Sequence, residues 1–307
     1  MIWKILRRLK NYSKLMIKKK LIIGTANFGK KYGIAKSKVD QRTLSKILEY
    51  AKYQKLKYFD TAILYKNNQK LTNNLNSQST INLKIAPNKK WINLDYIHKK
   101  FHDMSRDKNI KINSIMFHDV KILFTINGKL IFKNLMILKK RNFFKKIGVS
   151  IYDFEDLNFI LKNFKINVVQ CPFSILDRRL INDKWLKKLN SSKIEVHVRS
   201  IFFQGLLTNE NLTKNRYFKR WQPKFQKWFK DINKNDFSTS DVCLSYVLKY
   251  KIDKIVVGIN DQNHLDSIIN FKKVKNLKKF DYIKNDNKNL YDTRKWSHLW
   301  LNEKKIK

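Results

Sequence analysis

Short apolar runs alternate with amphipathic stretches from one end of the chain to the other. Eight apolar runs have the length and composition of strands buried on both faces of a parallel sheet. They are Leu21–Gly24, Lys57–Asp60, Thr80–Lys84, Ser114–His118, Lys146–Val149, Val168–Cys171, Glu195–Arg199 and Lys254–Gly258. The segments between them carry apolar residues at helical spacing, as in residues 43–51, 154–161 and 242–248.

Eight successive strand–helix units predict an α/β fold, a (β/α)8 TIM barrel in a single domain. The competing doubly wound fold requires a GxGxxG motif directly after the first strand. The first strand here runs into GTANFG at residues 24–29, where the glycine spacing differs from that motif. We therefore expect a barrel over residues 20–275, a basic N-terminal extension over 1–19 and a C-terminal tail over 276–307.

Two interpretations of the N-terminal extension stay open. Apolar residues at helical spacing lie between its lysines and arginines, namely Ile2, Ile5, Leu6, Leu9 and Met16. This pattern is typical of a basic amphipathic helix on an anionic membrane. We prefer a misassigned start at Met16 or a loose tail, because the strand-like residues 21–23 follow almost at once.

The C-terminal tail also has two interpretations. It could fold over the barrel mouth, or its aromatic residues could pack against the outer helices. These residues are Tyr291, Trp296, His298 and Trp300.

The charge of the chain raises the question of nucleic-acid binding. The 307 residues include 67 Lys and Arg against 24 Asp and Glu, a formal net charge of +43. The lysines are spread along the whole chain, and no known nucleic-acid-binding module accompanies them. We interpret the charge as a general bias in residue usage and expect only nonspecific, salt-sensitive contact with nucleic acid.

Two cysteines, Cys171 and Cys243, cannot build a disulfide framework, and neither belongs to a CxxC motif. They indicate a reducing compartment, hence a cytoplasmic protein, and argue against a structural zinc site. The sequence contains no apolar run near the ~18 residues of a membrane span, so we expect no transmembrane segment.

Four residues with reactive side chains lie at, or just beyond, the ends of three consecutive predicted strands. Asp60, Lys84 and His118 close the second, third and fourth strands, and Tyr65 lies just beyond Asp60. In a barrel these strand ends meet on the C-terminal face. Singly they could be a helix cap, one lysine among many, a core histidine and a rim aromatic. Together they are better explained as one functional group of residues, because burying a lysine at the end of an apolar strand is costly unless another residue pairs with its charge.

The chemistry of this set points to carbonyl reduction. A phenol has an ordinary pKa near 10, which a neighbouring ammonium lowers. A carboxylate keeps that ammonium charged, and a neutral imidazole can hydrogen-bond a carbonyl oxygen. Such a set can protonate an oxygen while a carbonyl is reduced. Because it contains no hydride source, it implies a nicotinamide cofactor.

From about residue 20 to about residue 270 the chain resembles the aldo-keto reductases. The resemblance rests on GTANFGKKYGI (24–34), FDTAILY (59–65), NLK (82–84) and MFHD (116–119). It implies a catalytic tetrad of Asp60, Tyr65, Lys84 and His118. In the family the tyrosine is the general acid, the lysine lowers its pKa, the aspartate pairs with the lysine and the histidine orients the carbonyl.

Further segments are similar to the family's cofactor-binding motifs: IGVS (147–150), VVQCPFSILDRR (168–179), VRSIFFQGLL (198–207) and VVGINDQNHLDSI (256–268). The cofactor-binding residues implied are Gly24, Thr25, Ser150, Gln170, Arg199, Ser200, Gln204, Gly205, Gly258, Asn260 and His264. Arg199 stands where many members place an aromatic that stacks on the nicotinamide. The phosphate loop has no Lys or Arg, with His264 the nearest candidate, so the resemblance leaves NADPH and NADH both open.

The resemblance implies reduction of an aldehyde or ketone to an alcohol, or the reverse reaction. The segment 198–207 is closest to reductases of bacterial surface-sugar pathways, which suggests a sugar-derived substrate. One departure concerns Lys66-Asn67-Asn68-Gln69, where the family usually reads G-x-x-E. The alternatives are a non-catalytic nicotinamide-binding regulatory barrel and, less favoured, a basic nucleic-acid-binding protein.

Overall fold

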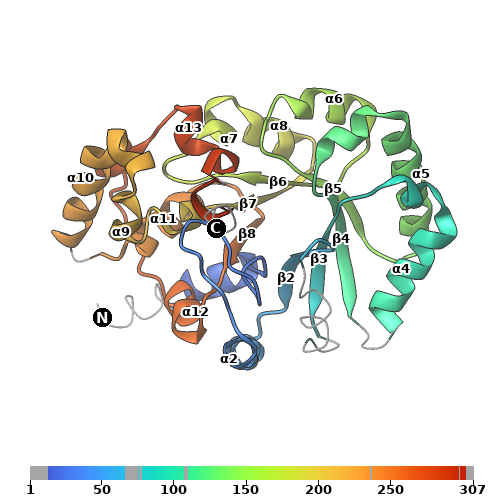
Figure 1. Cartoon of the computed structure of the whole chain (residues 1–307), viewed down its shortest axis with the longest axis horizontal. Coiled ribbons are helices and arrows are strands. Elements are labelled where there is room, and N and C mark those ends of the chain that lie inside the picture. The colour runs from blue at the N-terminus through green and yellow to red at the C-terminus, as the bar shows by residue number, and fades with distance from the viewer. Residues whose placement is uncertain are drawn as a thin grey trace, which may run out of the picture.

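The computed structural model describes residues 13–65, 75, 78–106, 110–235, 237–296 and 298–301. Within this part of the chain, eight parallel strands close into a barrel in the order β1 to β8, and β8 pairs with β1. Helices surround the strands (Figure 1). The predicted (β/α)8 barrel is confirmed.

The strands lie where the apolar runs predicted them, with small differences at their ends. β4 differs most, because it begins at Lys111 and ends one residue before His118. The strands are β1 (Leu21–Gly24), β2 (Tyr58–Ala62), β3 (Thr80–Ile85), β4 (Lys111–Phe117), β5 (Lys146–Ser150), β6 (Val168–Pro172), β7 (Glu195–Arg199) and β8 (Lys254–Gly258).

Helices follow most of the described strands, and an inserted group, η3 to α10, separates β7 from its helix α11. The α-helices are α2 (Gln41–Tyr53), α4 (Leu94–Arg106), α5 (Ile126–Lys140), α6 (Asp156–Asn163), α7 (Arg179–Asn182), α8 (Trp185–Ser191), α9 (Glu210–Thr213), α10 (Gln222–Asn233), α11 (Thr239–Leu248), α12 (Gln262–Ile269), α13 (Lys288–Tyr291) and α14 (His298–Leu301). The 3₁₀ helices are η1 (Lys89–Ile92), η2 (Val120–Phe124), η3 (Phe203–Gly205), η4 (Arg216–Trp221), η5 (Lys278–Ile283) and η6 (Thr293–Trp296).

Local sequence explains where the helices begin. The Asp40 side chain accepts a hydrogen bond from the Thr43 amide at 2.8 Å and caps α2. Ser238 and Asp241 form a reciprocal capping box at the start of α11. Such caps satisfy backbone N–H groups that have no partner within the helix, so each fixes the first turn of its helix.

The core extends beyond the predicted barrel at both ends. Residues 13–20 are helical, and Ile17 is fully buried in the core. Trp296 in the C-terminal tail is also fully buried and packs against Phe203 and Phe218. The apolar residues noted before Ser13 lie outside the described residues.

The tail therefore packs onto the barrel by aromatic contacts. The Tyr291 ring lies 4.0 Å from the Arg179 guanidinium carbon, and His298 contacts Tyr217 edge-on. The Trp300 side chain is not among those the structure describes.

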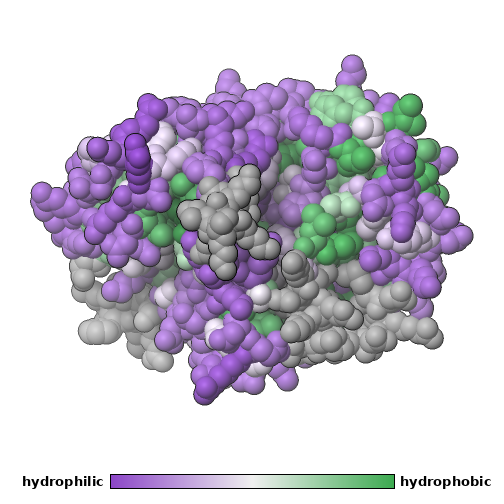
Figure 2. Space-filling model, in the orientation of Figure 1, coloured by the Kyte–Doolittle hydropathy of each residue, from purple (hydrophilic) through white to green (hydrophobic). Residues whose placement is uncertain are grey.

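The visible surface is mainly hydrophilic (Figure 2). Exposed apolar side chains gather near the start of α5, where Phe124, Ile126 and Leu130 are 41%, 78% and 42% exposed. None of the described helices is both long and apolar enough to cross a bilayer. Cys171 and Cys243 are buried and unbonded.

Candidate active site

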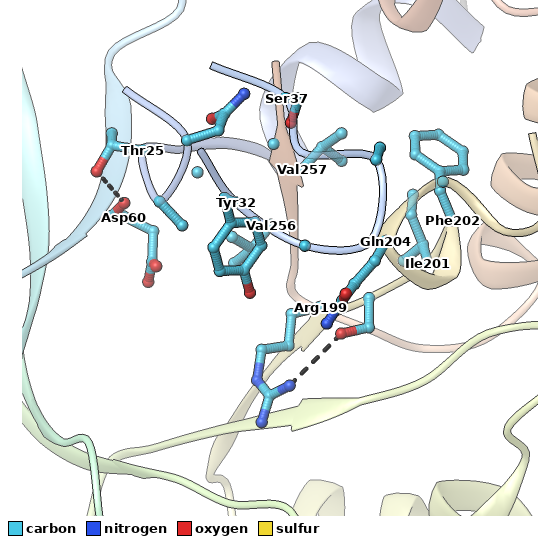
Figure 3. Close-up of a pocket in the computed structure, with 18 of the residues that line it drawn as sticks. Thr25, Tyr32, Ser37, Asp60, Arg199, Ile201, Phe202, Gln204, Val256 and Val257 are labelled. Carbon is cyan, nitrogen blue, oxygen red and sulfur yellow. Dashed lines mark hydrogen bonds between the residues drawn. The ribbon is translucent and has the colours of Figure 1, made fainter. Parts of the chain in front are cut away.

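The carboxyl ends of the strands surround one pocket, which holds about 1170 Å³ of empty space, part of it open solvent. Every candidate site residue lines this pocket: Gly24, Thr25, Asp60, Tyr65, Lys84, His118, Ser150, Gln170, Arg199, Ser200, Gln204, Gly205, Gly258, Asn260 and His264. The sequence motifs are spread over more than two hundred residues, and barrel closure brings them together. Figure 3 shows part of the pocket.

A buried polar network forms the floor of the pocket. Asp60 and Lys84 are only 3% and 4% exposed, and the Lys84 ammonium donates to the Asp60 carboxylate. The other Asp60 oxygen accepts from Gln170 Nε2 at 2.7 Å. Gln170 Oε1 lies 3.4 Å from the Ser150 hydroxyl. Strands β2, β3, β5 and β6 place these side chains, and the network keeps a buried carboxylate and ammonium paired, as their desolvation requires.

Tyr65 and His118 lie above this network. Their rings meet edge to face, with centroids 6.2 Å apart and planes at 86°. Lys84 Nζ is 5.8 Å from the Tyr65 ring centroid. The tetrad expected from the resemblance therefore forms a single cluster in space.

The electrostatics of Tyr65 differ from the expectation. Burial raises the pKa of the Tyr65 phenol, and Asp60 and Tyr152 raise it further. The charge that lowers this pKa is the Arg199 guanidinium, where the family resemblance names a lysine. Lys84 is committed to Asp60, so its charge is already balanced. The phenol is consequently protonated at neutral pH.

His118 is neutral at the same pH. Burial lowers its pKa to about 4, and the positive charges of Lys84 and Arg199 contribute in the same direction. Its buried Nδ1 has no hydrogen-bond partner among the described residues. A neutral imidazole with an unused nitrogen is suited to hydrogen-bond a ligand.

The opposite part of the pocket is formed by the loops after β1, β7 and β8. The Gln204 side chain accepts a hydrogen bond from the Ile34 amide at 3.2 Å, which joins the first and seventh loops. Asn27 Nδ2 donates a hydrogen bond to the Ile259 carbonyl oxygen at 2.9 Å, which joins the loops after β1 and β8. The buried Asn27 Oδ1 has no partner among the described residues.

Backbone geometry explains the glycines in this region. Gly205 has a φ of +93°, where a side chain would be strained. A Cβ built at Gly258 meets nothing within 4 Å, so this glycine borders open space in the pocket. Lys66–Gln69, where the family's glycine and glutamate are replaced, lie outside the described residues.

The pocket lining also includes residues that were not among the site candidates, and Asn27, Tyr32 and Tyr152 are three of them. Asn27 and Tyr32 lie within the 24–34 motif, and Tyr152 follows Ser150 by two positions. The sequence therefore already placed Asn27 and Tyr32 inside a motif and Tyr152 just beyond one. Only the closed barrel shows that their side chains face the same space.

The comparisons with known proteins agree on the architecture. A sequence model of the Aldo/keto reductase family matches residues 20–289. An aldo-keto reductase from Bacillus halodurans, in its holo form, superimposes with a TM-score of 0.66 at 18% identity, covering 86% of this chain and 90% of the other. A glycerol dehydrogenase from Gluconobacter oxydans superimposes with a TM-score of 0.64 at 16% identity, covering 86% and 90%.

No curated protein matches the chain. At these identities the solved structures establish the fold alone. The family match carries more weight, because it spans most of the sequence, including every segment that lines the pocket. The chain therefore belongs to the aldo/keto reductase family and is an NAD(P)-dependent oxidoreductase.

Proposed function

We propose that the protein reduces an aldehyde or ketone to an alcohol with NADPH or NADH, or catalyses the reverse reaction, with Tyr65 as general acid and base. The observation that carries this proposal is the convergence of Asp60, Lys84, Tyr65 and His118 in the pocket that also holds the candidate cofactor residues. A proton donor and a cofactor cleft in one pocket are what carbonyl reduction requires.

The residues present fit a dinucleotide. The pocket continues from the Tyr65 region to the loops after β1, β7 and β8, and it is bordered by the open space at Gly258. Two buried polar atoms with no described partner, Asn27 Oδ1 and His118 Nδ1, belong to residues that line it. When bound, a nicotinamide cofactor supplies the hydride that the carbonyl carbon accepts.

The chain's own groups handle the proton. The raised pKa of Tyr65 keeps its Oη protonated until the carbonyl oxygen gains charge. Neutral His118 donates a hydrogen bond that holds the carbonyl oxygen near the phenol. As the proton leaves, the positive charge of Arg199 stabilises the phenolate. In the reverse reaction the phenolate accepts the proton of an alcohol.

Cofactor preference stays open between NADPH and NADH. Burial lowers the pKa of His264, while Asp261 opposes this shift. His264 is then neutral near pH 7 and offers no permanent charge to a 2′-phosphate. We assign Ser150 and Gln170 to the nicotinamide end, and Gln204, Gly205, Asn260 and His264 to the phosphate end.

The substrate we propose is a small carbonyl compound, with sugar-derived aldehydes or ketones as the first class to screen. The two buried, unbonded cysteines support a cytoplasmic location. Contact with nucleic acid would be nonspecific and would weaken steeply between about 50 and 200 mM salt.

A fluorescence titration and one matched pair of variants test the function. We expect NADPH or NADH to quench tryptophan fluorescence saturably, and Tyr65→Phe to lower turnover about 10²- to 10⁴-fold with cofactor affinity unchanged. Tyr53→Phe is the control, because Tyr53 is 78% exposed on α2.

Three outcomes separate the alternatives. Turnover that survives Tyr65→Phe would exclude this phenol as the proton donor. Cofactor binding without turnover of any carbonyl would favour the regulatory barrel. Absence of binding by either cofactor would refute the proposed function.

A further inference from the structure

Arg199 is the feature of the pocket that the proposed reaction does not fully use. It ends β7, and its side chain lies beside Tyr32 in the pocket (Figure 3). Its Nη2 donates to the Ile151 carbonyl at 2.8 Å. Its guanidinium carbon lies 4.0 Å from the Tyr152 ring centroid. These contacts hold the guanidinium at a defined position.

The positive charge of Arg199 is unbalanced within the described pocket. The described residues that line the pocket include two positively charged side chains, Lys84 and Arg199, and one carboxylate, Asp60. Lys84 pairs with Asp60, and no described carboxylate forms an ion pair with Arg199. A half-buried guanidinium that faces a pocket without a counter-ion is therefore available to an anion from solution.

Other arginines near this end of the barrel are paired. Arg178 binds Asp281 at 2.9 Å, and Arg179 binds Asp177 at 2.8 Å. Arg294, whose guanidinium also lies against the Tyr152 ring, binds Asp153 at 2.9 Å. Arg199 differs from these three in facing the pocket with no carboxylate partner among the described residues.

The charge of Arg199 acts on the reacting end of the pocket. It lowers the pKa of Tyr65 against the dominant effect of burial, and it helps burial to lower the pKa of His118. At the phosphate end, by contrast, the pKa of His264 is shifted by burial and by Asp261, and Arg199 is not one of the causes. Arg199 is therefore placed to contact a substrate held between Tyr65 and His118.

We propose that the Arg199 guanidinium binds an anionic group, a carboxylate or a phosphate, carried by the carbonyl substrate, and that the enzyme thereby selects anionic aldehydes or ketones over neutral ones. This inference rests on the proposed function, since it names the substrate class of the same site. A planar guanidinium suits either anion, because both offer paired oxygen acceptors.

The test compares substrates that differ mainly in charge. The carboxylate pair is 4-oxobutanoate and its methyl ester, and the phosphate pair is glyceraldehyde 3-phosphate and glyceraldehyde. Values of kcat/KM are measured at one fixed ionic strength for the wild type, Arg199→Met, Arg199→Lys and Arg141→Met. Arg141 is an exposed arginine at the end of α5, so its replacement removes the same charge away from the pocket.

We expect the wild type to prefer one charged substrate over its neutral partner by about 10- to 100-fold, the ratio that a charge-assisted hydrogen bond supplies. Which pair shows the preference identifies the anion. Arg199→Met should reduce this preference to less than about threefold, Arg199→Lys should retain part of it, and Arg141→Met should leave it unchanged. Thermal melts confirm that the variants are folded.

Equal kcat/KM within both pairs in the wild type would overturn the inference while leaving the proposed function intact. A second contrary result would be a charge preference that survives in Arg199→Met while cofactor affinity falls, which would assign Arg199 to the cofactor. If no test substrate is turned over, ligand-observed NMR with 4-hydroxybutanoate and with glycerol 3-phosphate decides. Binding of either compound that Arg199→Met abolishes would support the anion site without the reaction, and binding of neither, or equal binding to wild type and Arg199→Met, would refute it.

Discussion

The ion pair between Asp60 and Lys84 provides a quantitative test of the pocket floor. Asp60→Asn keeps the shape of the side chain but removes its charge. Lys84, 4% exposed, would then remain buried without a counter-ion. An asparagine also has one side-chain oxygen, whereas Asp60 uses one oxygen for Lys84 and the other for Gln170. In the variant, either the Lys84 ammonium or the Gln170 amide, both of them donors, would face the N–H₂ group of the new side chain.

Both effects destabilise the folded state. Breaking a buried ion pair by removing one partner costs about 3–5 kcal/mol, so we expect Asp60→Asn to lower the free energy of unfolding by that amount. The double variant Asp60→Asn/Lys84→Met should recover a large part of this loss, because it leaves no unpaired charge. Asp286→Asn is the control and should cost less than about 1 kcal/mol, since Asp286 is exposed in its pair with Lys284.

Urea unfolding, followed by both circular dichroism and tryptophan fluorescence, measures these differences. Coincident transitions would establish two-state unfolding and permit the comparison. A loss for Asp60→Asn no larger than that for Asp286→Asn would refute the reasoning. So would a double variant that is less stable than Asp60→Asn.

The remaining predictions concern His118 and two glycines. The pKa of His118 is about 4 in the folded state and near 6.5 when unfolded, so the unfolded state binds more protons between these values. Stability should fall as the pH drops from about 6.5 to 4, by up to about 1.4 kcal/mol per pH unit, and unfolding curves of His118→Gln should lose this dependence; an equal slope in both proteins would contradict it. Gly148→Ala should lower stability by about 1–3 kcal/mol or more, because its Cβ would lie 2.4 Å from the Val168 carbonyl oxygen. Gly258→Ala should leave the melting temperature unchanged and weaken cofactor binding about tenfold, and normal cofactor affinity would show that the cofactor does not pass there.

Local pattern was sufficient for the fold. Strands β1, β7 and β8 have the predicted bounds because short apolar runs buried on both faces leave little freedom in where a strand begins and ends. β4 begins at Lys111, earlier than predicted, because its first residues include an exposed lysine that the apolar pattern does not mark. The motifs also identified many of the residues that face the pocket, since strand ends on one face of a barrel must meet, but they did not single out Asn27, Tyr32 or Tyr152.

Charge balance and burial within the pocket depended on tertiary contacts. The sequence places Lys84 among many lysines, and its pairing with Asp60 was implied by the family resemblance alone. The sequence cannot show that Gln170 binds the other Asp60 oxygen, nor that Arg199 is the cation that lowers the pKa of Tyr65. The packing of Trp296 against Phe203 and Phe218 likewise joins segments far apart in the chain.

The sequence by itself therefore determined the order of elements, the barrel and the set of residues at its carboxyl end, because these follow from periodicity and local motifs. Tertiary structure decided which of those residues are paired, protonated or open to a ligand. A pKa or an unbalanced charge depends on solvent exposure and on neighbours within several ångströms, and long-range folding brings those neighbours from separate strands.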